Sequence, residues 1–303
     1  SGGETYVVFG SSVPTRINMT NLNGSDGFTL HEDVQGDWFG WSVSGAGDVN
    51  GDGIDDIVIG ARTADLEGMR TPGKAYVVFG SSTGFDTTLN VRAINGKNGF
   101  TIHGELEAAN LGFSVCGAGD VNGDGIADII VGAPFASPSS WSYRVGKTYV
   151  VFGSSDGFKP IIEVSSLDGS DGFSVTGNSR GGKLGLVACG AGDMNGDGLD
   201  DVIIGAPGVN PYGDNYYSMG WAYRTRFTGA AYVVFGSTSP FPAKIGVGSL
   251  DGSNGLALYG ESGHNEAGTS VSGAGDVNGD GIDDIIIGAP NADGRSHNSG
   301  RSY

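Results

Sequence analysis

The sequence predicts an all-β protein, a β-propeller of four blades with four antiparallel strands in each blade. One long unit recurs four times along the 303 residues, each copy contains four short apolar segments, and no segment has a convincing helical period. Gly occupies 58 positions, far above its usual share of about 7%, so turns are frequent. Because one four-stranded unit cannot bury both of its faces alone, such units are expected to stack around an axis.

Two markers define the repeat. The segment GAGDVNGDG at 45–53 returns at 117–125, as GAGDMNGDG at 190–198, and at 273–281. The segment YVVFG begins at Tyr6, Tyr76, Tyr149 and Tyr232. We expect one domain over 1–303, with blades at 40–104, 111–177, 185–260, and 268–303 together with 1–31.

The second copy shows how each unit gives four strands. LGFSVCGAGD at 111–120 alternates apolar and small residues, and ADIIVGAP at 127–134 is a nearly continuous apolar run, typical of a strand covered on both faces. KTYVVFGS at 147–154 gives the third strand, and DGFSVTG at 171–177 gives the fourth. Pro and Gly occupy the junctions.

The order of these segments suggests how the chain closes. It starts at strand 3 of one blade and ends just after strand 2 of another, and GRSY at 300–303 matches GETY at 3–6. We expect the C-terminal strands 1 and 2 to pair with the N-terminal strands 3 and 4, which would remove the open sheet edges. The alternative is a chain cut from a longer array of repeats.

Charge and cysteine content narrow the class of protein. Asp and Glu number 34 against 16 Lys and Arg, a net charge of −18, which argues against nucleic acid as a partner because phosphate binding needs a basic surface. No run approaches the ~18 apolar residues of a membrane span. Cys116 and Cys189 occupy equivalent repeat positions, and we expect two buried free thiols, with a disulfide between neighbouring blades as the alternative.

The repeated GAGDxNGDG loop is the candidate metal site. Side-chain oxygens at loop positions 1, 3, 5 and 9, with a main-chain carbonyl at position 7, can converge on one hard cation, and three carboxylates in so short a loop repel one another without it. Oxygen ligands and a high coordination number favour Ca²⁺, about four ions in all. The predicted ligands are Asp48, Asn50, Asp52, Ile54, Asp56; Asp120, Asn122, Asp124, Ile126, Asp128; Asp193, Asn195, Asp197, Leu199, Asp201; and Asp276, Asn278, Asp280, Ile282, Asp284.

The sequence argues against two other interpretations of this loop and leaves a third open. An EF-hand needs flanking helices and a Glu at position 12, where this chain has Ile59, Val131, Ile204 and Ile287. A phosphate-binding loop lacks the following helix, and its Asp residues would repel phosphate. A metal-free loop, in which Asp and Asn side chains cap turns, stays open as an alternative.

These motifs resemble the FG-GAP repeats of integrin α-subunit propellers and their bacterial relatives. The FG of YVVFG, the GAP at 132–134, 205–207 and 288–290, and the D-x-N-x-D-G-x-x-D loop all match, and the first repeat departs with GAR at 60–62. The resemblance implies calcium in the hairpin between strands 1 and 2, and ligand binding on the opposite face. Integrin propellers have seven blades, whereas four units are found here.

On that opposite face, two insertions at 135–147 and 208–229 are rich in aromatic residues and Arg, which dominate binding hot spots. They are expected to contact a protein or glycan; the alternative is that they fold over and plug the blade tops. The candidate ligand-binding residues are Trp141, Tyr143, Arg144, Tyr216, Tyr217, Trp221, Tyr223 and Arg224.

The sequence therefore favours a secreted or cell-surface, calcium-binding adhesion or recognition module in which calcium holds the blades rigid. Millimolar extracellular calcium would keep even weak loops occupied. A structural unit of a surface layer or filament, and a domain of a polysaccharide-acting enzyme, are the alternatives. We do not expect an enzyme, because no non-repeated pair of acid, base or nucleophile is found.

Overall fold

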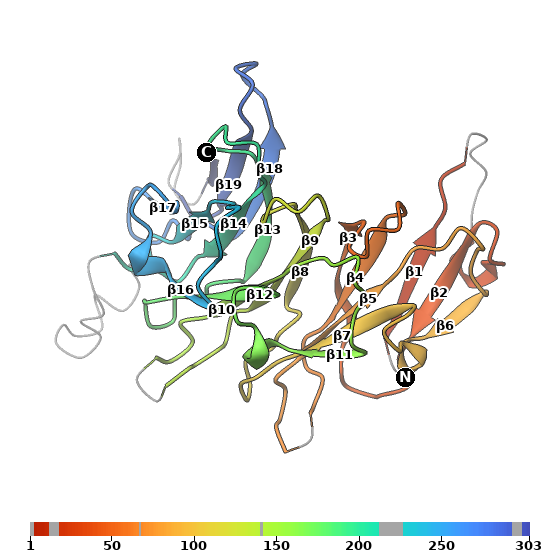
Figure 1. The fold of residues 1–303 in the computed structure, drawn as a ribbon. Coiled ribbons are helices and arrows are strands. Elements are labelled where there is room, and N and C mark those ends of the chain that lie inside the picture. The colour runs from red at the N-terminus through yellow and green to blue at the C-terminus, as the bar shows by residue number, and fades with distance from the viewer. Residues whose placement is uncertain (1–2, 12–17, 67, 140–141, 212–226, 293–298) are drawn as a thin grey trace.

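The structure is a computed structural model that describes residues 3–11, 18–66, 68–139, 142–211, 227–292 and 299–303. It is all-β, and its five sheets follow one another in chain order, with the N- and C-terminal sheets at opposite ends of the row (Figure 1).

The first sheet contains β1 (Glu4–Val8), β2 (Gly27–His31) and β6 (Thr88–Asn90). The second contains β3 (Phe39–Gly47), β4 (Asp56–Ala61), β5 (Lys74–Val78), β7 (Gly99–His103) and β11 (Ile161–Glu163). The third contains β8 (Ser114–Gly119), β9 (Asp128–Ala133), β10 (Lys147–Val151), β12 (Gly172–Thr176) and β16 (Lys244–Gly246). The fourth contains β13 (Val187–Gly192), β14 (Asp201–Ala206), β15 (Ala230–Val234) and β17 (Gly255–Tyr259).

The fifth sheet contains β18 (Ser270–Gly275), β19 (Asp284–Ala289) and β20 (Arg301–Ser302). Short 3-10 helices lie at η1 (Met19–Asn21), η2 (Val91–Ala93), η3 (Val164–Ser166) and η5 (Val247–Ser249).

The core lies between neighbouring sheets. Strands β9 and β14 are buried along their whole length, as their continuous apolar sequences predict. The first strands of successive sheets, β3, β8, β13 and β18, contact one another in that order. The hairpins after these strands lie at one end of the molecule, and the loops after the second strands lie at the other (Figure 1).

A fifth strand on the outer edge of a sheet was not predicted. The connection between the third and fourth strands of one sheet reaches back and pairs in parallel with the fourth strand of the preceding sheet, as β6 does with β2, β11 with β7, and β16 with β12. A Phe from each connection stacks on a buried Phe of the preceding sheet; the ring-centroid distances are 4.1 Å for Phe85 on Phe28, 4.2 Å for Phe158 on Phe100, and 4.4 Å for Phe241 on Phe173.

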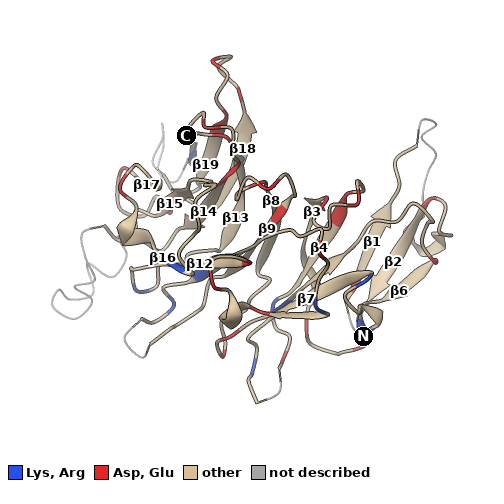
Figure 2. Ribbon diagram, in the orientation of Figure 1, with Lys and Arg blue, Asp and Glu red and all other residues tan. Residues whose placement is uncertain are grey.

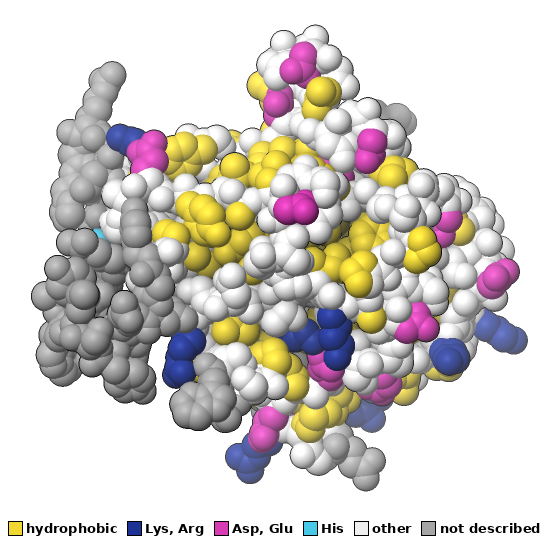
Figure 3. Space-filling view, turned by 60° about the vertical axis from the view of Figure 1, so that its left-hand side comes forward, with side chains coloured by type: hydrophobic (Ala, Val, Ile, Leu, Met, Phe, Trp, Pro, Cys, Tyr) yellow, Lys and Arg dark blue, Asp and Glu magenta, His cyan; other side chains and the backbone are white. Residues whose placement is uncertain are grey.

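The expected closure of four blades is not confirmed. Among the described residues β1 pairs with β2 alone, and the edge of β19 that was expected to receive Glu4–Val8 is occupied by β20. Tyr303 extends this pairing, since its N–H and C=O both bond to Ile287 at 2.9 Å. The GRSY segment thus takes the third-strand position of its own sheet. Figure 3 shows hydrophobic side chains at the surface on this side of the molecule. In the last sheet and its hairpin, Val277, Ile282 and Ile286 are exposed.

The prediction of free thiols was wrong, because Cys116 and Cys189 form a disulfide. The two residues are 73 positions apart in the chain, but they face each other from β8 and β13, with Cα atoms 5.1 Å apart. Ser44 occupies the same level on β3, and its hydroxyl lies 3.8 Å from Cys116 Sγ. The bridge therefore links the first strands of two neighbouring sheets.

Candidate functional site

The predicted metal-ligand residues lie in the hairpins between first and second strands, and the Asp at position 9 is the first residue of the second strand. Figure 2 shows that Asp and Glu residues gather in these hairpins at one end of the molecule, whereas Lys and Arg lie mostly toward the other end. The same path recurs in every hairpin, with positive φ at the Gly residues in positions 4 and 6, such as 71° at Gly51 and 85° at Gly53.

Each hairpin is closed by its own carboxylates. In the first, Asp48 accepts the N–H of Asp52 at 3.0 Å and the N–H of Gly53 at 2.7 Å, while Asp52 accepts the N–H of Ile54 at 3.0 Å. The corresponding bonds occur in the other three hairpins. These bonds hold the side chains at positions 1 and 5 against the main chain of their own turn.

The Asp at position 9 joins its hairpin to the third strand of the same sheet. Asp56 accepts the N–H of Val49 at 3.0 Å and the N–H of Gly80 at 2.7 Å, so one carboxylate connects the hairpin to the end of the third strand. Asp128 and Asp201 make the same pair of contacts in their sheets. Burial raises the pKa of all three despite these bonds, to about 6, about 7 and about 6 respectively. Each therefore needs further positive charge nearby to stay ionised at low cost.

The donor set suits a hard cation, since it contains oxygen atoms alone. In the described residues, however, no group of three Asp, Glu, His or Cys side chains converges closely enough to hold a metal ion. The three carboxylates of each hairpin accept main-chain N–H groups instead. The composition and burial of these carboxylates thus fit calcium, and their convergence on one point is not seen.

Neighbouring hairpins are linked by a residue that the sequence analysis did not single out. The carboxylate of Asp200, at position 8, accepts the N–H of Asp120 in the preceding hairpin at 2.8 Å, and Asp283 accepts the N–H of Asp193 at 3.0 Å. This contact requires Gly at position 119 for two reasons: its φ is 78°, and a Cβ there would collide with Asp200. In the second hairpin, position 8 is Ala127, so the link to the first hairpin is limited to its main-chain N–H, which donates to Asp48 O at 3.1 Å.

The structure describes only part of the two insertions that were predicted to bind a ligand. Tyr143 and Arg144 lie in the loop after β9, where Tyr143 is 53% exposed and the Arg144 guanidinium carbon is 5.1 Å from the centroid of its ring. The other predicted contact residues, Trp141, Tyr216, Tyr217, Trp221, Tyr223 and Arg224, lie outside the described residues.

The same face contains an aromatic cluster that the sequence analysis missed. Trp38 and Trp41 lie at the start of β3, Arg62 follows β4, and Phe113 precedes β8. The Arg62 guanidinium carbon is 4.4 Å from the ring centroid of Trp38, 4.0 Å from that of Trp41 and 5.3 Å from that of Phe113. The four residues come from three separate segments, so no local motif reveals the cluster.

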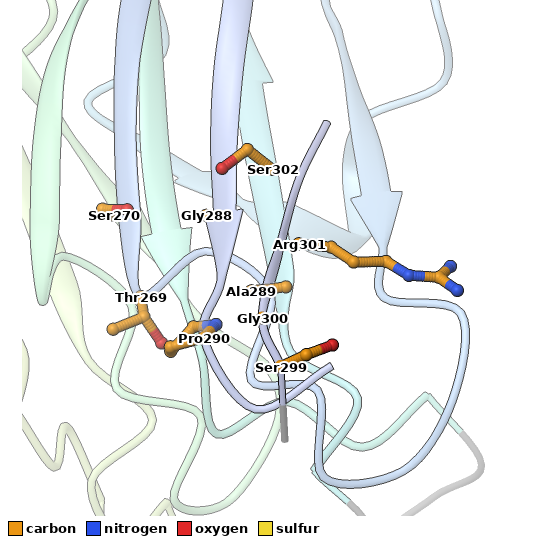
Figure 4. Close-up of a pocket in the computed structure, with 9 residues that line it drawn as sticks. All are labelled: Thr269, Ser270, Gly288, Ala289, Pro290, Ser299, Gly300, Arg301 and Ser302. Carbon is orange, nitrogen blue, oxygen red and sulfur yellow. The ribbon is translucent and has the colours of Figure 1, made fainter. Parts of the chain in front are cut away.

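A pocket of about 480 Å³ opens beside β20 in the last sheet. Figure 4 shows that its wall is formed largely by main chain and small side chains, and that Arg301 extends away from Thr269 and Ser270. The guanidinium of Arg301 is bound to Glu261 at 2.6 Å. Nothing in this pocket combines charge, exposure and aromatic surface as the cluster around Arg62 does.

No helix in the described part of the chain is long and apolar enough to cross a membrane.

Comparisons with known proteins agree with the repeat pattern. The family model for the FG-GAP repeat matches residues 39–78, 111–151 and 267–303. Integrin alpha pat-2 of Caenorhabditis elegans is 33% identical over 256 residues, which is 84% of this chain and 18% of that protein. Integrin alpha-5 of Xenopus laevis is 27% identical over 259 residues, 83% of this chain and 20% of that protein.

An enzyme is also among the similar proteins. Phosphatidylinositol-glycan-specific phospholipase D of Bos taurus is 31% identical over 171 residues, which is 55% of this chain and 18% of that protein. The chain thus spans about a fifth of the length of the curated relatives that it matches. The repeated hairpins, the sheets that follow one another in chain order and these matches lead to one conclusion: the chain contains FG-GAP repeats and resembles the integrin alpha subunits over more than four fifths of its length.

Proposed function

We propose that this chain is an extracellular calcium-binding adhesion module, whose hairpin face binds calcium and whose opposite face contacts a protein or glycan. The observation that carries the proposal is the recurrence of one oxygen-only hairpin in four successive sheets, with a buried carboxylate of raised pKa in three of them. The relatives named integrin support the adhesion role.

Calcium would be held by the predicted side chains at positions 1, 3, 5 and 9 and by the main-chain carbonyl at position 7. Its charge would offset the mutual repulsion of three carboxylates in each hairpin. Since each hairpin is hydrogen-bonded to the next, ions at this end would stiffen the whole row of sheets. The contact residues on the opposite face would include Tyr143 and Arg144, together with the other residues predicted in the two insertions.

Two features support a secreted or cell-surface location. Calcium is plentiful outside the cell, and the Cys116–Cys189 disulfide is a bond that persists in oxidising compartments. The alternative of an enzyme domain draws on the match to a phospholipase D, but that match covers a smaller share of this chain than the integrin matches do.

A calcium titration by calorimetry, with melting of the same samples, tests the proposal. We expect about four sites, and a free energy of unfolding that rises by about 2.7 kcal/mol per site when free calcium is 100 times the dissociation constant. A quadruple variant, Asp52→Ala, Asp124→Ala, Asp197→Ala and Asp280→Ala, should lose both effects.

The matched control is Asp86→Asn, which removes one exposed carboxylate from a loop outside the hairpins and should leave calcium binding unchanged. A wild-type melting curve that is the same in calcium and in chelator would contradict the proposal.

A further inference from the structure

The cluster of Trp38, Trp41 and Arg62 has the properties of a ligand site. The two indole rings are 5.3 Å apart between centroids, and the Arg62 guanidinium lies over both. Trp38 is 51% exposed and Trp41 is 44% exposed, so each ring keeps a large free surface. Core packing therefore does not account for two Trp residues at this place.

Arg62 carries a positive charge that is not paired with a carboxylate in the described part of the chain. Among the described residues it forms no salt bridge, and its Nε is buried without a hydrogen-bond partner. Burial lowers the pKa of its guanidinium. Such an unpaired charge is unusual in a chain with a net charge of −18, and it leaves hydrogen-bond donors available for an anion.

The backbone at Trp38 also points to a selected role. Its φ is 54°, a left-handed conformation that bulky side chains seldom adopt. The equivalent positions of the other repeats have the same conformation, with φ of 58° at Asn110, 56° at Lys183 and 51° at Glu266. Only the first repeat places an aromatic ring there, next to the only Arg that stands at the GAP position.

We propose that Trp38, Trp41 and Arg62 form a binding site for a saccharide that carries a carboxylate. The C–H face of a sugar ring stacks on a flat indole, and a guanidinium binds a carboxylate through two parallel N–H donors. Because the aromatic rings already hold the Arg62 side chain in place, little rotamer freedom is lost on binding. An acidic peptide side chain would supply the anion, but it has no flat face to cover two indoles.

The row of side chains continues in a way that suits a polymer of such sugars. Trp41 lies 5.5 Å from Phe113, and Phe113 lies 5.7 Å from Phe135, measured between ring centroids. The guanidinium carbon of Arg144 is 5.1 Å from the centroid of Phe135. Arg144, which is exposed, thus lies on an aromatic ring after β9 as the half-buried Arg62 does after β4, and the two belong to neighbouring sheets.

The inference rests on the proposed function, because it names the ligand class of the recognition face. The test uses the calcium-loaded full chain and two soluble probes, a hyaluronan hexasaccharide with glucuronate units and the neutral chitohexaose. We expect calorimetry to show binding of the hyaluronan probe at least tenfold tighter than binding of chitohexaose. Arg62→Gln and Trp41→Ala should each weaken it tenfold or more, and Arg62→Lys should weaken it less than Arg62→Gln.

The matched control is Lys97→Gln, which removes the same charge from an exposed turn outside the cluster and should change the dissociation constant less than twofold. Equal binding of both probes, an unchanged affinity in Arg62→Gln, or equally tight binding of an oligoglutamate peptide would overturn the saccharide site. Melting in calcium is followed in the same samples. Normal calcium stabilisation without saccharide binding would contradict this inference alone, whereas loss of calcium stabilisation would contradict the proposed function.

Discussion

Asp37 is a buried carboxylate, only 5% exposed, next to the cluster around Arg62. Burial, followed by the repulsion of Glu32, raises its pKa from 3.8 to about 6, and the attraction of Lys74 offsets this only in part. Its ionised form is therefore destabilised in the folded protein relative to the unfolded chain.

The pH dependence of stability follows from this sign. Between about pH 4 and 6 the folded protein holds a proton that the unfolded chain releases, so the contribution of Asp37 to stability falls as the pH rises through this window. Asp37→Asn should thus be more stable than wild type by about 1–2 kcal/mol at pH 7.5, and the difference should shrink toward pH 4.5. Urea unfolding at both pH values, in constant calcium, measures it, and Asp86→Asn serves as the exposed control. A gap that grows on acidification would show that the sign is wrong.

Residues that recur are the ones that the sequence could identify. Asp48, Asn50 and Asp52 stand at fixed spacing in every unit, so the loop and its chemical character were predictable without coordinates. Trp38 and Arg62 have no Trp or Arg at the equivalent positions of the other repeats. They come together only through the packing of two strands and a loop. A single-copy site of this kind leaves no period in the sequence.

At the scale of elements, the Cys116–Cys189 bridge joins β8 to β13. The double variant Cys116→Ser, Cys189→Ser restores the residue found in the other two repeats, and it should lower the free energy of unfolding by about 2–4 kcal/mol, because the bridge closes a loop of 73 residues in the unfolded chain. Denaturant unfolding without reductant measures the loss.

Reduction of the wild type with dithiothreitol should give the same loss, and the variant should not respond to it. Equal unfolding midpoints for the oxidised wild type and the variant would contradict the stabilising role.

The four main strands of each unit were predictable because their apolar runs are long and bounded by Gly and Pro. The outer strands β6, β11 and β16 were not, since each has three residues and no shared pattern: TLN, IIE and KIG. They form because a Phe that precedes each of them finds a buried Phe on the neighbouring sheet. This is a tertiary contact that strand propensity does not encode.

In the whole molecule each sheet contacts its neighbours in the row, so total stability depends on the separate interfaces between sheets. The interface between the third and fourth sheets has both the disulfide and the Asp200 bond, whereas that between the second and third has Ala127 and no bridge. The interface between the second and third sheets should therefore be the weaker one.

Ala127→Asp should strengthen the interface between the second and third sheets. Ala127 faces Gly47 as Asp200 faces Gly119, since a Cβ added at either Gly would lie 2.7 Å from the Cβ of its neighbour. A new carboxylate at position 127 should therefore accept the N–H of Asp48 and add about 1 kcal/mol. Asp200→Ala should lower the free energy of unfolding by about the same amount. Asp55→Ala changes the same loop position where the side chain is exposed, and it should leave the free energy of unfolding nearly unchanged. Thermal melting in calcium tests all three; no gain from Ala127→Asp combined with no loss from Asp200→Ala would refute the link.

Repeat number and strand order could be predicted from the sequence, but closure could not. The pairing of β20 with β19 depends on two residues and Tyr303 at the end of the chain. The match of GRSY at 300–303 to GETY at 3–6 is equally consistent with two arrangements. GRSY could itself pair with β19, or it could duplicate GETY while GETY pairs there.

The outer strands have a consequence for synthesis on the ribosome. Because β11 lies after β10 in the chain, the sheet of β3 to β7 keeps one open edge until residues 161–163 have emerged, well into the next repeat. At about 5–20 residues per second, that edge stays bare for several seconds after β7 is made. Each nascent repeat is thus finished by its successor, and the unit that folds is longer than the unit that recurs.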